Sequence, residues 1–267
     1  MIAEKRKGSR STKDIPAAIM QLLNSGKIET ANLVEWLAVD QKVLLKNLLQ
    51  ELNRNQYYDS IISDIESLQK KTVNTVNEAI GVGLFKNIQS NEDQEIFSKL
   101  ANHVSDCVRC WATYIIGFDK NLSILEKLSQ IQPFAADSHF GVREICWLAT
   151  RQSIANNLQE SIEILSKWTS NTDENIRRFA TEATRPRGVW CAHIEILKQS
   201  PEMALSILEP LKSDVSKYVQ NSVANWLNDA SKTKPEFVIE ICKRWKLGSN
   251  SKETAYIVSR ALRTLEK

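Results

Sequence analysis

The segment Asp173–Trp190, DENIRRFATEATRPRGVW, concentrates the residues that could do chemistry. It places one carboxylate, Glu182, among four arginines and close in sequence to Trp190. A fixed carboxylate can stabilise a developing positive charge, guanidinium groups bind phosphate, and an indole face attracts a cation. Together these groups suit a flat, cationic substrate that is attached to phosphate. The four arginines are Arg177, Arg178, Arg185 and Arg187.

A repeat in the sequence predicts the elements that position this segment. Short apolar openings recur, with Val108, Val142 and Ile176 spaced 34 residues apart and Val219 following after 43. A second apolar stripe follows each opening. From the second repeat onward, successive stripes lie 43 and then 34 residues apart. Both series agree if the unit is a 34-residue helix pair and the copy containing Glu182 carries nine extra residues between its helices. This period is close to those of TPR and HEAT-type repeats and predicts an all-α solenoid of stacked helix pairs.

Two faces can be read from the first helix of each repeat. Offsets 0, 3, 4 and 7 from the opening are apolar, which predicts one buried helical face. Offsets 2, 6 and 9 form a second face, and equivalent positions of successive repeats line up in a solenoid. We interpret this polar column as a binding face, and the alternative is a solvated helix face. Its last three layers are Glu144, Leu148 and Arg151; Arg178, Glu182 and Arg185; and Asn221, Asn225 and Asn228.

Composition also favours a helical globular protein. The chain has 267 residues, of which 42% are hydrophobic and 25% charged, with only eight glycines and six prolines. We expect a basic arm at 1–13 and a single HEAT-like solenoid over 14–267, with atypical helices at 14–100 and recognisable repeats at 101–267. In the atypical part, apolar stripes predict helices within 30–52, 58–80 and 92–108, with a break at Gly81–Gly83.

The cellular setting can be predicted in outline. The first residues lack the apolar core of a secretory signal, and no run approaches the eighteen apolar residues that a membrane span needs. Five cysteines without framework spacing fit reduced thiols. We therefore expect a cytoplasmic protein without a membrane partner, and we expect a monomer. The net charge of +3 permits nucleic-acid binding but does not argue for it alone.

The basic arm contains five cations and one acid, Glu4. It could neutralise phosphates by releasing their counterions, or it could be a disordered, solubilising tail. The sequence favours neither interpretation over the other. The five cations are Lys5, Arg6, Lys7, Arg10 and Lys13.

Other chemistries find little support. His103, Cys107 and Cys110 could bind a metal, but a structural zinc site needs four ligands and no second cluster exists. Neither a nucleophile motif nor a glycine-rich phosphate loop is present, so we expect no metal and no cofactor. Six of the seven tryptophans lie in amphipathic helices and are predicted to be core residues. Trp190 differs, because it follows Pro186 and Gly188 in the insertion, where an indole can be aimed at a ligand.

Three motifs carry a resemblance to a known family. GVREICWLATR, IRRFATEATRPRGVW and YVQNSVANWLNDASKTKP resemble the successive repeats of the DNA alkylation repair family, in the AlkC-like rather than the AlkD-like branch of HEAT-like alkylpurine DNA glycosylases. The resemblance covers roughly residues 100–247. It implies a solenoid that binds duplex DNA on its concave face and releases cationic N3- or N7-alkylated purines. One departure is that this chain reads Thr181-Glu182-Ala183 where related sequences often read Ser-Glu-Gly.

Carried over by motif, the resemblance assigns roles to residues of this chain. It implies that Glu144 and Glu182 are the carboxylates at the lesion and that Trp190 packs near it. The arginines of the second motif become phosphate or sugar contacts, and the asparagine layer meets the backbone further along the groove. We assign the following residues to DNA binding: Arg143, Arg151, Arg177, Arg178, Arg185, Arg187, Asn221, Asn225 and Asn228.

The chemistry of the lesion supports the same assignment. A purine alkylated at N3 or N7 is a cationic leaving group, so the enzyme need not protonate it. A fixed negative charge near the sugar cation, which also orients a water, and an aromatic face for the base would help, and Glu182 and Trp190 supply them. Glu144 aligns with Arg178 of the next repeat, and that pair could equally be an exposed salt bridge of little energetic value.

These observations predict an alkylpurine DNA glycosylase that acts on double-stranded DNA in base excision repair. A non-catalytic relative that binds damaged or branched DNA through the same face is the alternative. A third interpretation, a protein-binding helical scaffold, explains the repeats but not the RPRGVW insertion.

Overall fold

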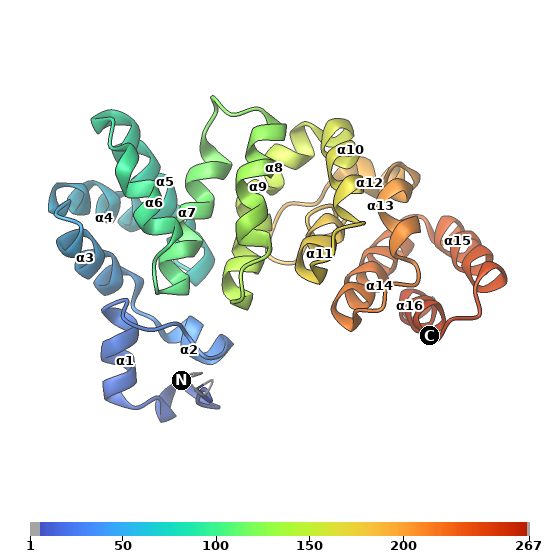
Figure 1. Ribbon diagram of the computed structural model, residues 1–267, viewed down its shortest axis with the longest axis horizontal. Coiled ribbons are helices and arrows are strands. Elements are labelled where there is room, and N and C mark those ends of the chain that lie inside the picture. The colour runs from blue at the N-terminus through green and yellow to red at the C-terminus, as the bar shows by residue number, and fades with distance from the viewer. Residues whose placement is uncertain (1–5, 266–267) are drawn as a thin grey trace. The chain divides into compact units, whose positions relative to one another are not determined.

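Helices make up every regular element that the structure, a computed structural model, describes in residues 6–265 (Figure 1). The all-α class is therefore confirmed. Of the basic arm, Glu4 and Lys5 fall outside the described residues, whereas Arg6 and the cations after it fall inside. The chain forms two compact units, one comprising Met1–Asn121 with Ser138–Ala149 and the other Leu122–Asp137 with Thr150–Lys267. The predicted single solenoid over 14–267 stays a prediction.

The first unit begins with short helices. The predicted helix within 30–52 is divided in two at Asp40. This residue accepts hydrogen bonds from the backbone N–H groups of Lys42 and Val43 and so caps the start of the second helix. The 58–80 and 92–108 stripes are likewise each divided between two helices. The elements are η1 (Thr12–Asp14), α1 (Ala17–Asn24), α2 (Leu33–Ala38), α3 (Gln41–Glu51), η2 (Asn55–Tyr57), α4 (Tyr58–Glu66), α5 (Val73–Asn91), α6 (Gln94–Ala101) and α7 (Asp106–Phe118).

The expected break at Gly81–Gly83 is wrong, because both glycines lie inside α5. A Cβ on Gly81 would come within 2.5 Å of the Cβ of Tyr114, and a Cβ on Gly83 within 2.8 Å of Cγ1 of Ile61. These glycines therefore allow α5 to approach α7 and α4 closely. Glycine is unfavourable in a helix interior by about 1 kcal/mol relative to alanine, and the tight packing against both neighbours explains its presence here.

The recognisable repeats follow the predicted spacing. The first helices of successive pairs begin at Asp106, Phe140, Glu174 and Lys217, with the same gaps of 34, 34 and 43 residues as the apolar openings. The helix α9 (Phe140–Asn156) contributes its first part to the first unit and its last turns to the second. The remaining elements are α8 (Ile124–Ala135), α10 (Leu158–Trp168), α11 (Glu174–Glu182), α12 (Glu195–Gln199), η3 (Pro201–Ala204), α13 (Leu205–Leu208), η4 (Glu209–Leu211), α14 (Lys217–Ser231), α15 (Pro235–Gly248) and α16 (Lys252–Leu262).

The predicted apolar face is buried in each unit. Val142 and Cys146 of α9 are fully buried in the first unit, and Phe179 and Ala183 are buried in the second. The six tryptophans assigned to the core are also buried, which confirms that prediction. The extra residues of the third pair lie in an irregular segment between α11 and α12, and this segment carries the candidate site.

Candidate nucleic-acid interface

Local sequence fixes the helix α11, which carries most of the candidate site. The carboxylate of Asp173 caps its first turn by accepting the N–H of Asn175 at 2.7 Å. Ile176 and Phe179 lie on its buried face. The helix ends at Glu182, so Arg178 precedes that carboxylate by one turn and Arg185 follows it by three residues.

Glu182 is a buried carboxylate that two arginines hold. Its side chain is only 6% exposed, and Nη1 of Arg185 donates to Oε1 at 2.7 Å. The hydroxyl of Ser222 on α14 donates to Oε2 at 2.7 Å, and Nη2 of Arg178 lies 3.7 Å from the same oxygen. Burial by itself would raise the pKa of Glu182, but the charges of Arg178 and Arg185 and the Ser222 hydrogen bond together lower it. Glu182 is therefore ionised at neutral pH.

The position of Glu182 in the last turn of α11 explains why its charge needs two arginines nearby. A carboxylate in the last turn of α11 faces the negative end of the helix dipole, which disfavours its charge. The two guanidinium groups offset both that field and the loss of hydration. Each carboxylate oxygen can accept two hydrogen bonds, and one position on each is used, by Arg185 on Oε1 and by Ser222 on Oε2. The 3.7 Å approach of Arg178 is too long for a hydrogen bond.

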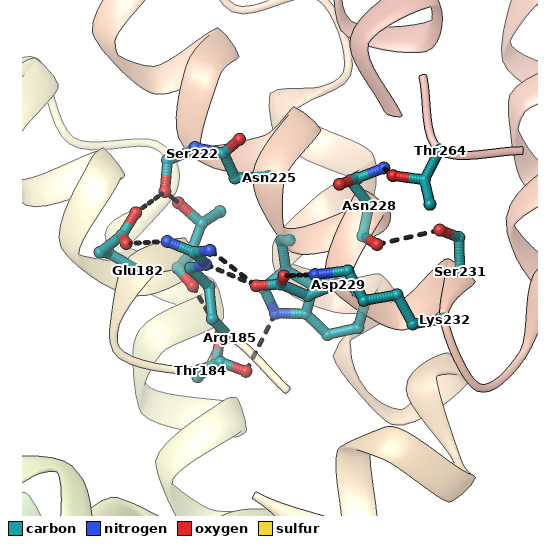
Figure 2. A network of polar contacts seen from close by, with 12 residues as sticks. Glu182, Thr184, Arg185, Ser222, Asn225, Asn228, Asp229, Ser231, Lys232 and Thr264 are labelled. Atoms are coloured by element: carbon teal, nitrogen blue, oxygen red, sulfur yellow. Dashed lines mark hydrogen bonds and ion pairs between the residues drawn. The ribbon is translucent and has the colours of Figure 1, made fainter. Parts of the chain in front are cut away.

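The polar network continues from Arg185 to the next helix (Figure 2). Nε of Arg185 donates to Oδ2 of Asp229 on α14 at 2.8 Å, and Lys232 donates to Oδ1 at 3.2 Å. Trp226 of the same helix donates its indole N–H to the carbonyl oxygen of Thr184 at 3.0 Å. The end of α11 is thus fastened to α14 by charged and neutral hydrogen bonds. Arg178 also stacks over the ring of Tyr218, 4.2 Å from its centroid.

The irregular segment after α11 is anchored by Arg151 from the last turns of α9. This guanidinium donates to the carbonyl oxygens of Ala183, Arg185 and Ala192 at 3.0, 2.7 and 3.0 Å. Its side chain is 4% exposed. The three bonds join both ends of the segment to α9, which is a structural role that the predicted contact with DNA did not include.

The same segment presents Trp190 to solvent. The residue is 86% exposed, and its φ of +66° lies in the left-handed region that a bulky side chain rarely adopts. The indole is therefore free to meet a ligand, as its place in the insertion suggests, and its contact with a lesion stays a prediction. Gly188, two residues earlier, is closely packed, since a Cβ there would lie 2.2 Å from Sγ of Cys191.

The arginines of the repeat openings have a different use from the predicted one. In each repeat the side chain just after the apolar opening donates to a carbonyl oxygen five or six residues earlier, at 2.7 to 3.0 Å. This contact holds the loop that enters the helix. Arg177 also forms a bidentate pair with Asp214 at 2.6 and 3.0 Å. The structure thus gives Arg143 and Arg177 a role in the fold, and their contact with DNA stays a prediction. The four residues are Arg109, Arg143, Arg177 and Gln220.

The asparagines of α14 also make contacts inside the second unit. Nδ2 of Asn228, which is buried, donates to the carbonyl oxygen of Ala261 at 3.1 Å and to Thr264 at 2.8 Å. Asn225 accepts from Arg263 at 3.0 Å, and Asn221 accepts from Tyr256 at 2.7 Å. Asn221 and Asn225 remain partly exposed, whereas Asn228 has little surface to offer a ligand.

Two further assigned residues differ in their surroundings. Glu144 lies in the first unit, where Oε2 accepts the indole N–H of Trp147 at 3.0 Å, and its role at a lesion stays a prediction. Arg187 is half-buried and donates from Nη2 to the hydroxyl of Thr233 at 3.1 Å. Its Nε is buried without a hydrogen-bond partner among the described residues. Arg187 makes no ion pair among the described residues, so the exposed part of its guanidinium can still bind an added anion.

Two residues of the network, Ser222 and Asp229, were not among those predicted from the sequence. Both lie on α14 in the repeat after Glu182, and both are buried. Asp229 follows Asn228 of the polar column directly, which is the one signal that could have drawn attention to it. Nothing in the types or spacing of residues singles out Ser222.

In the described residues, no helix is both long and apolar enough to cross a membrane.

Comparison with known proteins agrees with the resemblance in the sequence. Residues 141–264 match the family model described as DNA alkylation repair enzyme. The uncharacterized protein YhaZ of Bacillus subtilis is 36% identical over 150 residues, which are 56% of this chain and 38% of YhaZ. The match therefore spans well under half the length of that relative. The resemblance to the DNA alkylation repair family is confirmed over this segment.

Solved structures share the fold. The alkylpurine DNA glycosylase AlkC of Pseudomonas fluorescens, bound to DNA containing an abasic site analog, superposes with a TM-score of 0.69 at 21% identity, covering 97% of this chain and 66% of AlkC. AlkD2 of Streptococcus mutans has a TM-score of 0.61 at 24% identity, covering 78% of this chain and 97% of AlkD2. The predicted HEAT-like helical repeat fold is confirmed by these likenesses.

Proposed function

We propose that this chain is an alkylpurine DNA glycosylase that releases cationic N3- or N7-alkylated purines from double-stranded DNA. The observation that carries the proposal is Glu182, a buried and ionised carboxylate held by two arginines at the end of α11. It lies within the segment that matches the family of DNA alkylation repair enzymes. The irregular segment that follows it exposes the indole of Trp190.

Departure of a cationic purine requires little acid catalysis. Alkylation already weakens the glycosidic bond, and the bond breaks towards an oxocarbenium-like sugar. A fixed negative charge lowers the energy of that state more than the energy of the ground state, which is the condition for catalysis. Glu182 supplies this charge, and the lone pairs that Arg185 and Ser222 leave unused can orient the attacking water. The indole of Trp190 offers a π-face to the cationic base.

The arginines then have two tasks. Arg178 and Arg185 keep Glu182 ionised, whereas Arg187 is partly exposed, makes no ion pair among the described residues and can take a phosphate oxygen. Arg151 holds the segment that carries Trp190. Asn221 and Asn225, which are partly exposed on α14, remain proposed contacts to the DNA backbone.

A second candidate function is binding of damaged or branched DNA without catalysis. The enclosure of Glu182 favours it, because two cations neutralise much of the charge that catalysis would use. Both candidates predict DNA binding, and they differ in base release.

Incubation with alkylated duplex tests the proposal. The purified protein is mixed with duplex DNA that contains N3-methyladenine or N7-methylguanine, and free base is measured by chromatography against an unmodified duplex. Release of the alkylated base alone supports the glycosylase. Tight binding of the duplex without release of either base would instead favour the non-catalytic function.

A further inference from the structure

The N-terminal segment is pinned to the first unit at Arg6. Its guanidinium donates from both Nη atoms to the two carboxylate oxygens of Glu35 at 2.6 and 2.7 Å. The Glu35 side chain is 1% exposed and also accepts the N–H of Ala31 at 2.8 Å. Burial by itself would raise the pKa of Glu35, but the hydrogen bonds from Arg6 and Ala31 and the charge of Arg6 together lower it. The pair is therefore ionised, and a bidentate pair with one buried partner fixes the direction of the chain.

Further contacts hold the residues that follow. Nδ2 of Asn32 donates to the carbonyl oxygen of Ser9 at 2.8 Å, and a Cβ on Gly8 would lie 2.4 Å from that nitrogen. Only glycine allows this close approach. Ser11 caps the short helix η1, and Ile15 is buried. Residues 6–15 thus lie against α2 and the loop before it (Figure 1).

The same contacts leave three cations directed outward. Lys7, Arg10 and Lys13 are exposed, and the described residues offer none of them an ion pair. Glu35 already neutralises Arg6, so within the segment only Asp14 opposes their charge. A segment that is already held in place loses less conformational entropy on binding than a free tail does, so these three cations can bind an anion at a smaller entropic cost.

The chemistry of this surface favours phosphate over other anionic partners. Within residues 6–15 the one apolar residue, Ile15, is buried, so the segment itself has no apolar group to enter a lipid bilayer or a protein interface core. The exposed hydroxyl of Thr12 lies between the cations and is a typical donor to phosphate oxygens.

We infer that residues 6–15 form a docked arm that binds the phosphate backbone of DNA through Lys7, Arg10 and Lys13. The inference rests on the proposed function in taking DNA as the partner. It adds an electrostatic contact in the first unit that does not depend on the chemistry at Glu182. Contacts of this kind carry no sequence preference, so intact and alkylated duplex benefit equally.

Salt dependence of duplex binding tests the arm. The variant Lys7→Gln/Arg10→Gln/Lys13→Gln is compared with wild type and with Lys120→Gln/Lys243→Gln/Lys246→Gln, which removes the same charge from exposed positions elsewhere. Each phosphate contact contributes about 0.9 to the slope of log affinity against log salt, so the arm variant should have a slope shallower by about 2.7. Between 50 and 200 mM salt, wild type should then lose roughly 40-fold more affinity than the arm variant. The control variant should follow wild type.

A charge-preserving change tests whether the arm is docked. Arg6→Lys keeps the cation but cannot form the bidentate pair with Glu35, so we expect duplex affinity to fall at least threefold at 100 mM salt. Equal slopes for the arm variant and wild type would overturn the arm alone, as would equal slopes for the arm and control variants. Wild-type affinity in Arg6→Lys would show a loose tail and overturn the docked arrangement. Failure of wild type to bind any duplex would overturn the arm and the proposed function together.

Discussion

Arg185 donates to Glu182 at 2.7 Å, so the arginine assigned to phosphate and the carboxylate assigned to catalysis form one buried ion pair. Asp229 extends this pair on the far side of the guanidinium. The carboxylate is thereby kept charged in a site that would otherwise favour its protonated form. Stability and the proposed chemistry consequently depend on the same few groups.

Acid titration should reveal the ionised state of Glu182. Its pKa is lowered from the ordinary value of 4.5, so its contribution to stability is present above about pH 4.5 and is lost as the pH falls through the lower folded-state value. Urea unfolding of wild type and Glu182→Gln should show a constant difference in free energy of unfolding from pH 8 to pH 5, which shrinks below about pH 4. A difference that already shrinks between pH 8 and pH 6 would mean a raised pKa and contradict the prediction.

Arg177→Ala should destabilise the fold more than it weakens DNA binding. Removing the guanidinium leaves the buried carboxylate of Asp214 without its partner and releases the loop before α11, at a cost of about 2–4 kcal/mol. Thermal melting and duplex titrations at several salt concentrations measure the two effects. An unchanged melting temperature with a shallower salt slope would restore Arg177 as a phosphate contact.

Arg187→Ala should give the opposite pattern. Its guanidinium donates one hydrogen bond to the uncharged hydroxyl of Thr233 and makes no ion pair among the described residues, so we expect a smaller loss of stability, about 1–2 kcal/mol. The slope of log affinity against log salt should become shallower by about 0.9, as for one phosphate contact. Duplex titrations at several salt concentrations measure this slope, with Arg177→Ala as the control. An unchanged slope for Arg187→Ala would remove Arg187 from the interface.

The anchoring role of Arg151 can be tested by proteolysis. Arg151→Ala removes three hydrogen bonds to the segment that follows α11, so trypsin should cut the Arg187–Gly188 bond at least tenfold faster than in wild type. Gln152→Ala, an exposed change at the next position of α9, is the control and should leave the rate unchanged. Equal cleavage rates in all three proteins would show that other contacts hold the segment.

Trp190→Ala should lower excision of cationic lesions with little loss of stability. The side chain is 86% exposed, so its removal leaves no cavity, whereas the binding face for the base is lost. Trp226→Ala, which truncates a fully buried indole, should cost about 3–5 kcal/mol and serves as the contrast. Thermal melting and base release on both variants decide the matter. Undiminished excision by Trp190→Ala would withdraw the indole from the site.

Sequence periodicity predicted the repeats and the insertion because both depend on local patterns. The starts of α7, α9, α11 and α14, the buried face and the exposure of Trp190 all follow from spacing and turn residues. The use of each polar side chain depends instead on its neighbours in three dimensions. Ser222 and Asp229 act on residues about 40 positions earlier, which no local pattern reveals.

Two local signals also had a use in the fold that the sequence does not reveal. Gly81 and Gly83 signal a break by composition, yet they serve close helix packing, because Tyr114 and Ile61 occupy the space that a side chain would need. Arginine after an apolar opening suggests phosphate binding, yet Arg143 and Arg177 bind backbone carbonyl oxygens of the preceding loops. A guanidinium serves either acceptor, and only the fold determines which one is near.

Base release by Glu182→Gln beside Asp229→Asn tests the central claim most directly. Both variants remove one carboxylate charge from Arg185, so they perturb the fold in a similar way, but only the first removes the charge proposed to stabilise the sugar cation. Single-turnover excision from duplex containing N7-methylguanine should fall on the order of a hundredfold in Glu182→Gln, a barrier increase of about 3 kcal/mol, with DNA affinity nearly unchanged. Asp229→Asn should stay within about threefold of wild type, a change below about 0.7 kcal/mol. Wild-type excision by Glu182→Gln, or an equal loss in both variants, would contradict the assignment of Glu182 as the catalytic carboxylate.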